Sequence, residues 1–108
     1  MIVRLWSART SQVQSQAYLQ HFSGAVLPAL RKFEGYLGST VLTRPTEGVV
    51  EIMVLTVWQS LSAIDAFAGP DREAAVVAPE AAALLTDFDR RVRHFDTATI
   101  DVLPLSST

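Results

Sequence analysis

Two histidines are the side chains of this chain best suited to move a proton near neutral pH. His94 falls in an extended pattern with Asp96 two residues later, a spacing that could form a histidine–carboxylate pair. The alternative is a histidine that makes a hydrogen bond at an interface between subunits. His21 stands beside Phe22 in a helical pattern, as either a general base or a half-buried, solvated side chain. We take His94 and His21 as the candidate bases.

Arg4 is the candidate cation. It alternates with Ile2 and Trp6 on one face of an expected strand, and a charge on a largely buried strand needs a partner. That partner is either a carboxylate, for which Glu51 and Asp96 are the candidates, or the negative charge of a bound ligand. In the second case Arg4 would stabilise an anion during a reaction.

A flat apolar ligand would need aromatic side chains around it. The candidates for this role are Trp6, Tyr18, Phe22 and Phe67. Tyr18 could also donate a hydrogen bond to the ligand, and the alternative is a core tyrosine with a solvated hydroxyl. Trp58, at the end of the most apolar stretch, is expected to fill the core.

The composition excludes several kinds of site and partner. The 108 residues include no cysteine, so disulfides, thiolate metal ligands and thiol nucleophiles are ruled out. The acids are scattered, the histidines lie far apart and no glycine-rich phosphate loop occurs, so we expect neither a metal nor a cofactor. A net charge of −2 without a basic stripe argues against nucleic acid. The chain also lacks a membrane-spanning apolar run and a signal-peptide pattern, so we expect no membrane association and a cytoplasmic location.

Residues 49–58 are the stretch around which the other elements must be arranged. They are rich in β-branched side chains and predict a strand that is apolar on both faces, so both faces should be covered. Ser60 caps a helix that Gly69 ends, Asp71 caps a further short turn, and Pro79 opens a last helical turn.

The first helix carries an expected defect. Its apolar residues recur at every fourth position, but the ring of Pro28 would crowd the carbonyl group four residues earlier. We therefore expect a kink or break between Phe22 and Pro28. The remaining expected elements are a strand at 2–6, a turn at 7–10, a helix that begins after Ser11, a strand at 36–43, a turn at 44–48 and a strand at 91–102.

This order of elements, β-α-β-β-α-β, predicts an α+β, ferredoxin-like fold in one domain over residues 1–108. In that fold both helices cover one face of a four-stranded antiparallel sheet. The other face has no element left to cover it, although the strand at 49–58 is apolar on both sides. We therefore expect a homodimer in which two sheets pack face to face.

Four stretches carry a resemblance to a known family. They are residues 33–38 (FEGYLG), 55–60 (LTVWQS), 66–69 (AFAG) and 92–95 (VRHF). Together they resemble the antibiotic biosynthesis monooxygenase family, within the dimeric α/β-barrel superfamily. The resemblance implies a dimeric α/β barrel. It also implies an activity of the kind seen in some members, which oxidise polyphenolic, polyketide-like substrates with molecular oxygen and no cofactor.

Other members of that family cleave haem with an asparagine, a tryptophan and a histidine. The resemblance places Trp6, Phe67 and Val77 at those positions. Since valine cannot ligate iron, haem cleavage by that route is not expected. The resulting hypothesis is a monooxygenase that binds a small aromatic or polyketide-like substrate. The alternative is a non-catalytic dimeric protein of the same fold, which binds a small ligand or has a structural role.

Overall fold

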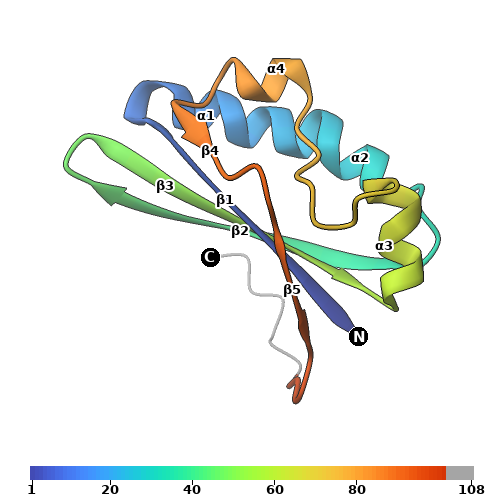
Figure 1. Cartoon of the computed structure of the whole chain (residues 1–108). Helices are drawn as coiled ribbons and strands as arrows, with labels where there is room; N and C mark the ends of the chain where they lie inside the picture. Colours follow the sequence, from blue (N-terminus) through green and yellow to red (C-terminus); the bar gives the residue numbers. More distant parts are fainter. Residues whose placement is uncertain (102–108) are drawn as a thin grey trace.

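An antiparallel sheet and a layer of helices on one of its faces make up the fold (Figure 1). The computed structural model describes residues 1–101. In chain order its elements are β1 (Ile2–Ser11), α1 (Gln12–His21), the π-helix η1 (Phe22–Val26), α2 (Leu27–Leu30), β2 (Tyr36–Thr46), β3 (Val49–Trp58), α3 (Leu61–Ala68), α4 (Pro79–Ala82), β4 (Asp87–Phe88) and β5 (Arg93–Asp96). The predicted ferredoxin-like α+β fold is confirmed.

The sheet has the order β2-β3-β1, and both β4 and β5 pair with the remaining edge of β1. Two short strands therefore share the position that one long last strand was expected to fill. β1 and β3 form the centre of the sheet, with an unbroken antiparallel register from Ile2 opposite Trp58 to Ser11 opposite Val49.

Burial alternates along β3, as expected for a strand with one covered face. The buried side chains are Val50, Ile52, Val54, Thr56 and Trp58, and the half-buried ones between them are Glu51, Met53, Leu55 and Val57. The buried set packs against the helices in one core that also contains Tyr18, Phe22, Leu30 and Ile64. We call this side of the sheet the covered face.

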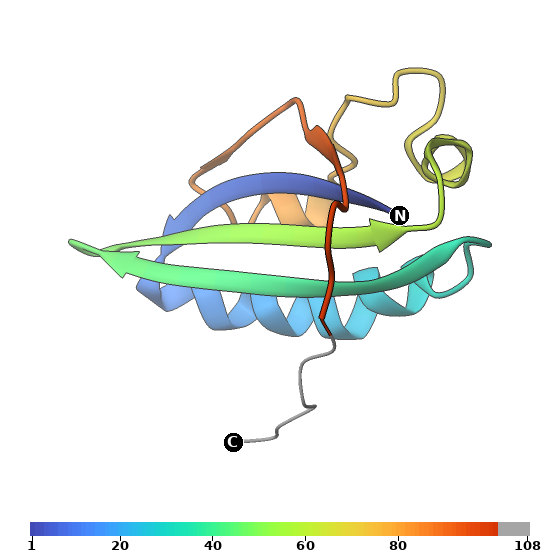
Figure 2. The same ribbon diagram turned by 90° about the horizontal axis from the view of Figure 1, so that it is seen from below.

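Within residues 1–101, no helix covers the opposite side of the sheet, which we call the open face. Figure 2 shows it with β1, β3 and β2 in front of α1 and α2. Paired residues of neighbouring strands point to the same face, so Val3 and Leu5 lie beside Val57 and Leu55 there. Leu42 and Phe95 on the flanking strands are about half exposed, at 48% and 47%. An apolar surface remains on this side of the sheet.

The first strand is longer than predicted, because the expected turn at 7–10 is part of β1. Ala8 is fully buried, and the buried Thr10 donates its hydroxyl to the carbonyl oxygen of Leu84 at 2.7 Å. A small residue and a threonine with an acceptor can both occupy the covered face. The polar composition of this stretch was therefore misleading.

The predicted strand at 91–102 is wrong in its extent. β5 covers only Arg93–Asp96, and residues 97–101 have no regular structure, while Val102 lies outside the described residues. The reason is the available partner: Asp96 pairs with Ile2, the first residue of β1, so no strand remains to pair beyond it.

The hairpin between β2 and β3 is tighter than the predicted turn at 44–48. Its two loop residues, Glu47 and Gly48, have φ values of 49° and 82°. This left-handed pair is typical of two-residue hairpins whose turn matches the twist of the strands. Pro45 lies within β2, which it can do because β2 is an edge strand.

The kink or break predicted between Phe22 and Pro28 takes another form: residues 22–26 leave the α-helical pattern as a π-helix, and the helix continues without a break into α2. Leu27 donates its backbone N–H to Phe22, five residues earlier, and Pro28 follows in the first turn of α2. Four α-helical residues turn through about 400°, so a stripe with a period of four drifts by roughly 40° at each step. The wider π turn offsets this drift and keeps Tyr18, Phe22, Val26 and Leu30 along one side of the helix.

Residues 69–78 join α3 to α4, and we call them the connecting segment. Ser60 caps α3 as predicted, and Gly69 ends it with a φ of 83°. Asp71 accepts a hydrogen bond from the backbone N–H of Glu73, which forms a turn, and Ala74 then makes a single bridge to Arg91. Among residues 1–101, no helix combines the length and apolar character that a membrane crossing requires.

Candidate functional site

A cavity of about 70 Å³ lies between the covered face and the helices. Its lining comes from β1, β3, the α1–η1–α2 helix, α3, the connecting segment, α4 and the residue before β5. The lining residues are Arg4, Trp6, Tyr18, Phe22, Val26, Leu30, Val54, Thr56, Phe67, Val76, Val77, Ala78, Ala81 and Val92. Five of the seven predicted site residues therefore share one cavity: Arg4 and the four aromatic side chains.

Arg4 is the charged residue of this lining and is only 4% exposed. Its Nη1 donates to the carbonyl oxygen of Arg72 and its Nη2 to that of Ala74, both at 2.7 Å. The guanidinium carbon lies 5.4 Å from the centre of the Phe67 ring. Burial lowers the pKa of Arg4 to about 10, so the group stays charged at neutral pH.

The predicted ion pair of Arg4 with Glu51 or Asp96 is wrong for the described residues. Glu51 stands opposite Arg9 on the open face and pairs with Arg44 at 2.7 Å. Asp96 lies opposite Ile2 and is exposed. The alternation of side chains along a strand explains why Arg4 does not pair with Glu51: the two residues point to opposite faces of the sheet.

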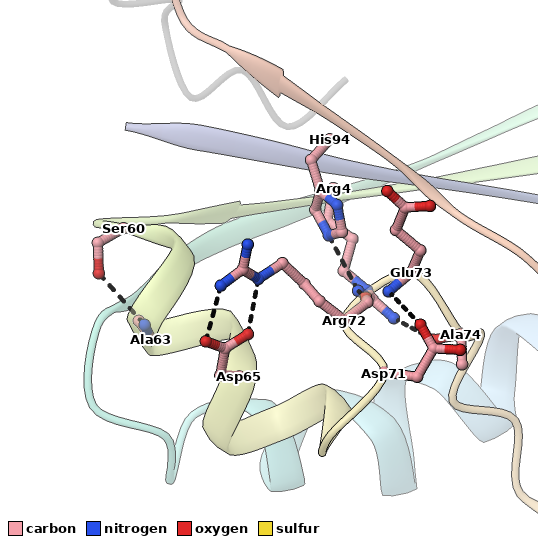
Figure 3. A network of polar contacts seen from close by, with 9 residues as sticks. All are labelled: Arg4, Ser60, Ala63, Asp65, Asp71, Arg72, Glu73, Ala74 and His94. Carbon is pink, nitrogen blue, oxygen red and sulfur yellow. Dashed lines mark hydrogen bonds and ion pairs between the residues drawn. The ribbon is translucent and has the colours of Figure 1, made fainter.

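His94 contacts the site through Arg4 (Figure 3). Its Nε2 lies 3.0 Å from Nη1 of Arg4, and since a guanidinium only donates, Nε2 is the acceptor and the ring proton belongs on Nδ1. Burial, with the positive charges of Arg4 and Arg72, lowers the pKa of His94 and favours this neutral form. The pair with Asp96 that the spacing suggested does not form, because Arg4 is the residue opposite His94.

Arg72 connects the same cluster to α3. Its guanidinium binds the carboxylate of Asp65 through two hydrogen bonds, Nε to Oδ1 at 2.6 Å and Nη2 to Oδ2 at 2.8 Å (Figure 3). The backbone of Arg72 meanwhile accepts the bond from Arg4. The connecting segment is thus held to α3 by a side-chain pair and to β1 by Arg4.

The aromatic residues surround the apolar part of the cavity. The ring centres of Trp6 and Tyr18 are 6.3 Å apart, and Trp6 donates its indole N–H to the carbonyl oxygen of Asp89 at 2.8 Å. Burial raises the pKa of Tyr18 to about 12, so its hydroxyl remains protonated at neutral pH. Phe67 meets the core through Phe33 and Trp58, with ring centres 5.5 Å from each.

His21 lies away from this group. As far as residues 1–101 define it, the lining includes neither histidine. The Nε2 atom of His21 is buried without a hydrogen-bond partner in the described part of the chain, and its ring centre is 6.4 Å from that of Tyr18. The two candidate bases are therefore not brought together.

Asp65, Arg72 and Thr56 were not singled out from the sequence, although all three belong to the site or its support. The pairing of Asp65 with Arg72 crosses Gly69 and depends on how the chain turns there, which no local pattern reports. The apolar run at 74–78 was the available signal, because it has no regular element of its own and lines the cavity at Val76, Val77 and Ala78.

The histidine of the haem-degrading route has no counterpart in the described lining of the cavity. Trp6, Phe67 and Val77 all line it, so the three positions compared with the haem-degrading members are indeed together. Valine has no lone pair to donate, and in the described lining no histidine, cysteine or methionine replaces it. Tyrosine can also ligate haem iron, but burial keeps the hydroxyl of Tyr18 protonated. The described residues also contain no group of three or more potential metal-binding side chains.

Known proteins share this fold and this sequence pattern. The sequence profile of the family described as "Antibiotic biosynthesis monooxygenase" matches residues 1–79. A Bacillus cereus structure that carries the same family name aligns with 97% of this chain and 98% of its own, at 16% identity and a TM-score of 0.64. No curated protein sequence matches this chain.

Two further structures come with ligands. The haem-degrader MhuD from Mycobacterium tuberculosis, with two haems bound, is 25% identical and covers 94% of this chain and 99% of its own, with a TM-score of 0.58. The monooxygenase ActVA-Orf6 of Streptomyces coelicolor, in complex with nanaomycin D, is 17% identical and covers 95% and 91%, with a TM-score of 0.56. With the profile spanning most of its length, this chain belongs to the antibiotic biosynthesis monooxygenase family.

Proposed function

We propose that this protein is a cofactor-independent monooxygenase that acts on a small aromatic or polyketide-like substrate. The observation that carries the proposal is the lining of the cavity, in which one buried cation stands among four aromatic side chains. The family match and the nanaomycin D bound to ActVA-Orf6 support it.

The chemistry assigned to the site is the oxidation of a substrate anion by oxygen. A positive charge next to a phenol or enol lowers the pKa of that group, so Arg4 would favour the electron-rich anion. The anion passes electrons to O₂, one oxygen atom forms a carbonyl group on the ring in place of two hydrogens, and the other leaves as water. The aromatic lining would hold the ring and exclude water.

Neither histidine is needed for the first contact with the substrate in this scheme. Arg4 touches the cavity, whereas His94 reaches it through Arg4, so we propose that His94 fixes the position of the guanidinium. His21 and His94 can act as bases only on a substrate that extends past the described lining.

Entry of a substrate requires a local movement. The cavity holds about 70 Å³, whereas an engineered cavity that binds benzene measures about 150 Å³. Val76, at 50% exposure, and its neighbours in the connecting segment form one wall without the backbone ladder of a helix or sheet. We propose that this wall moves when a ring binds.

Oxygen consumption tests the proposal. The purified protein is mixed with a panel of anthrone-like and hydroquinone substrates, with and without added flavin, and oxygen uptake is recorded. Turnover without flavin that falls strongly in Phe67→Ala is expected. An absence of uptake above the uncatalysed rate for every substrate would argue against the enzyme.

The alternative is a ligand-binding protein without catalysis. The position of both histidines outside the described lining is the observation that supports it. Saturable binding of the same substrates without oxygen uptake would select this alternative.

We also propose a homodimer through the open face. Its central strands present Val3, Leu5, Met53, Leu55 and Val57, all half-buried in the single chain, which a second copy of the same sheet would cover. Light scattering should show a dimer at micromolar concentration, and Leu55→Asp should dissociate or unfold it because a buried unpaired charge costs several kcal/mol. Val13→Asp, at a helix site that is 87% exposed, is the control and should remain dimeric. A monomeric wild-type protein would refute the proposal.

A further inference from the structure

Arg4 uses only part of its hydrogen-bonding capacity. A guanidinium has five N–H donors. Two on Nη1 face Arg72 and His94, and one on Nη2 faces Ala74. Within residues 1–101, the Nε donor and the second Nη2 donor of Arg4 have no partner.

Among the arginines of residues 1–101, Arg4 is the buried one, and it has no salt bridge. Arg9, Arg44, Arg72 and Arg91 each form a salt bridge with a carboxylate. The other arginines without such a bridge in the described chain, Arg31, Arg90 and Arg93, are exposed to solvent. Arg4, by contrast, is only 4% exposed and takes part in no salt bridge within residues 1–101. A buried cation that lacks a carboxylate partner is costly to the folded state, and an anionic ligand would offset part of that cost.

We propose that Arg4 is the binding site for a carboxylate group of the ligand. The substrate class then narrows from an aromatic ring to a small aromatic acid, with its carboxylate on Arg4 and its ring among Trp6, Phe67 and Tyr18. The aromatic part of this inference rests on the proposed function. The carboxylate part rests on Arg4 alone, and it assigns the charge of Arg4 to binding the ligand instead of to ionising a phenol or enol.

The geometry favours a carboxylate over a single phenolate oxygen. The two free donors belong to Nε and Nη2, neighbouring nitrogens of one planar group, and a carboxylate presents two oxygens that match such a pair. The carbonyl groups of Arg72 and Ala74 and the imidazole of His94 hold the plane of the guanidinium from three sides. These contacts fix the orientation of the guanidinium before a ligand binds, which reduces the entropy lost on binding.

Two ligands of the same shape test the inference on the wild-type protein. Benzoate and benzamide differ in charge at the group that would face Arg4. Calorimetric titration should show benzoate binding at least about tenfold more tightly, because its hydrogen bonds are charge-assisted. Equal affinities, or tighter binding of benzamide, would overturn the proposal.

Two variants then test whether the preference for benzoate over benzamide depends on Arg4. Arg4→Lys keeps the charge but not the paired donors, so the preference for benzoate should shrink severalfold while the circular dichroism spectrum is unchanged. Arg9→Lys, on the same strand but on the open face, should keep the wild-type preference. A benzoate preference that persists in Arg4→Lys, or that is lost in Arg9→Lys, would count against Arg4.

This experiment is separate from the test of catalysis. Benzoate binding needs no oxygen and no turnover, so it can succeed although oxygen uptake fails. Conversely, oxygen uptake with neutral phenols and no preference for benzoate would retain the monooxygenase and remove the carboxylate.

Discussion

Arg4 and Arg9 lie five residues apart on β1 and face opposite sides of the sheet. Arg9 is on the open face, where it pairs with Asp87 and, at 3.1 Å, with Asp89. Arg4 is on the covered face, where its partners are two carbonyl groups and a neutral histidine. One strand thus holds one arginine with acids and one without.

The two environments shift the pKa values of these arginines in opposite directions. The hydrogen bond to Asp87, foremost among several causes, raises the pKa of Arg9, whereas burial lowers the pKa of Arg4 to about 10. An exposed ion pair of the first kind contributes little to stability, at most about 1 kcal/mol. A buried cation without a carboxylate partner costs free energy, which is why we assign Arg4 a role in binding.

The largest difference between the two faces is expected in the core. Ile52→Ala removes a fully buried side chain on the covered face and should lower the free energy of unfolding by about 2–4 kcal/mol at any protein concentration. Met53→Ala, the next residue, should act mainly through the dimer and reduce the concentration dependence of the urea midpoint. Equal, concentration-independent losses would contradict the distinction between the faces.

A smaller difference is expected between the two arginines. Arg4→Met leaves the carbonyl groups of Arg72 and Ala74 without a donor and should cost about 1–3 kcal/mol. Arg9→Met should cost less than about 1 kcal/mol, because its pairs are partly solvated. Urea unfolding of both variants measures the difference. A gain of stability in Arg4→Met would show that burial of the charge outweighs its hydrogen bonds.

A weaker effect should appear with pH. Since burial and neighbouring cations lower the pKa of His94, the unfolded chain binds a proton there at a higher pH than the folded chain does. His94 therefore contributes its stability above the ordinary histidine pKa of about 6.5, and this is lost as the pH falls through its folded value.

His94→Gln can keep an acceptor for Arg4 but has no titrating ring. Between about pH 7.5 and about pH 5, the melting temperature of the wild-type protein should fall more than that of His94→Gln. The comparison is needed because Asp65 and Glu73 also act on His94. Identical pH profiles would exclude a protonation effect at this site.

The smallest expected effect is that of haem. With haemin and a reductant under air, the Soret band should not decrease catalytically, because Val77 in the cavity offers no ligand for iron. The absorption of the Soret band is followed over time, with a haem-degrading relative as the positive control. Catalytic loss of the band with biliverdin-like products would show that the covered face supports a different haem site.

Local sequence patterns were sufficient where one element decides its own structure. The caps at Ser11 and Ser60, the strand at Val49–Trp58 and the end of α3 at Gly69 were all predicted in place. The aromatic and basic residues of the cavity were found for the same reason, because alternation along a strand and periodicity along a helix place them on the covered side.

Pairing between distant segments needed the tertiary structure. The polar composition of Ser7–Thr10 predicts a turn, but pairing with β3 makes these residues part of a strand. β5 ends at Asp96 because its partner strand, β1, begins at Ile2.

The sequence by itself determined the fold class, the alternation that separates the two faces of the sheet and the identity of the cation. Only the tertiary structure decided what surrounds that cation. Its partners are the backbone carbonyls of Arg72 and Ala74, and every residue has a carbonyl, so no side-chain pattern marks them. Whether the partner of Arg4 is a carboxylate or a backbone carbonyl depends on how a segment about 70 residues away in the sequence folds over it. Long-range packing decides this.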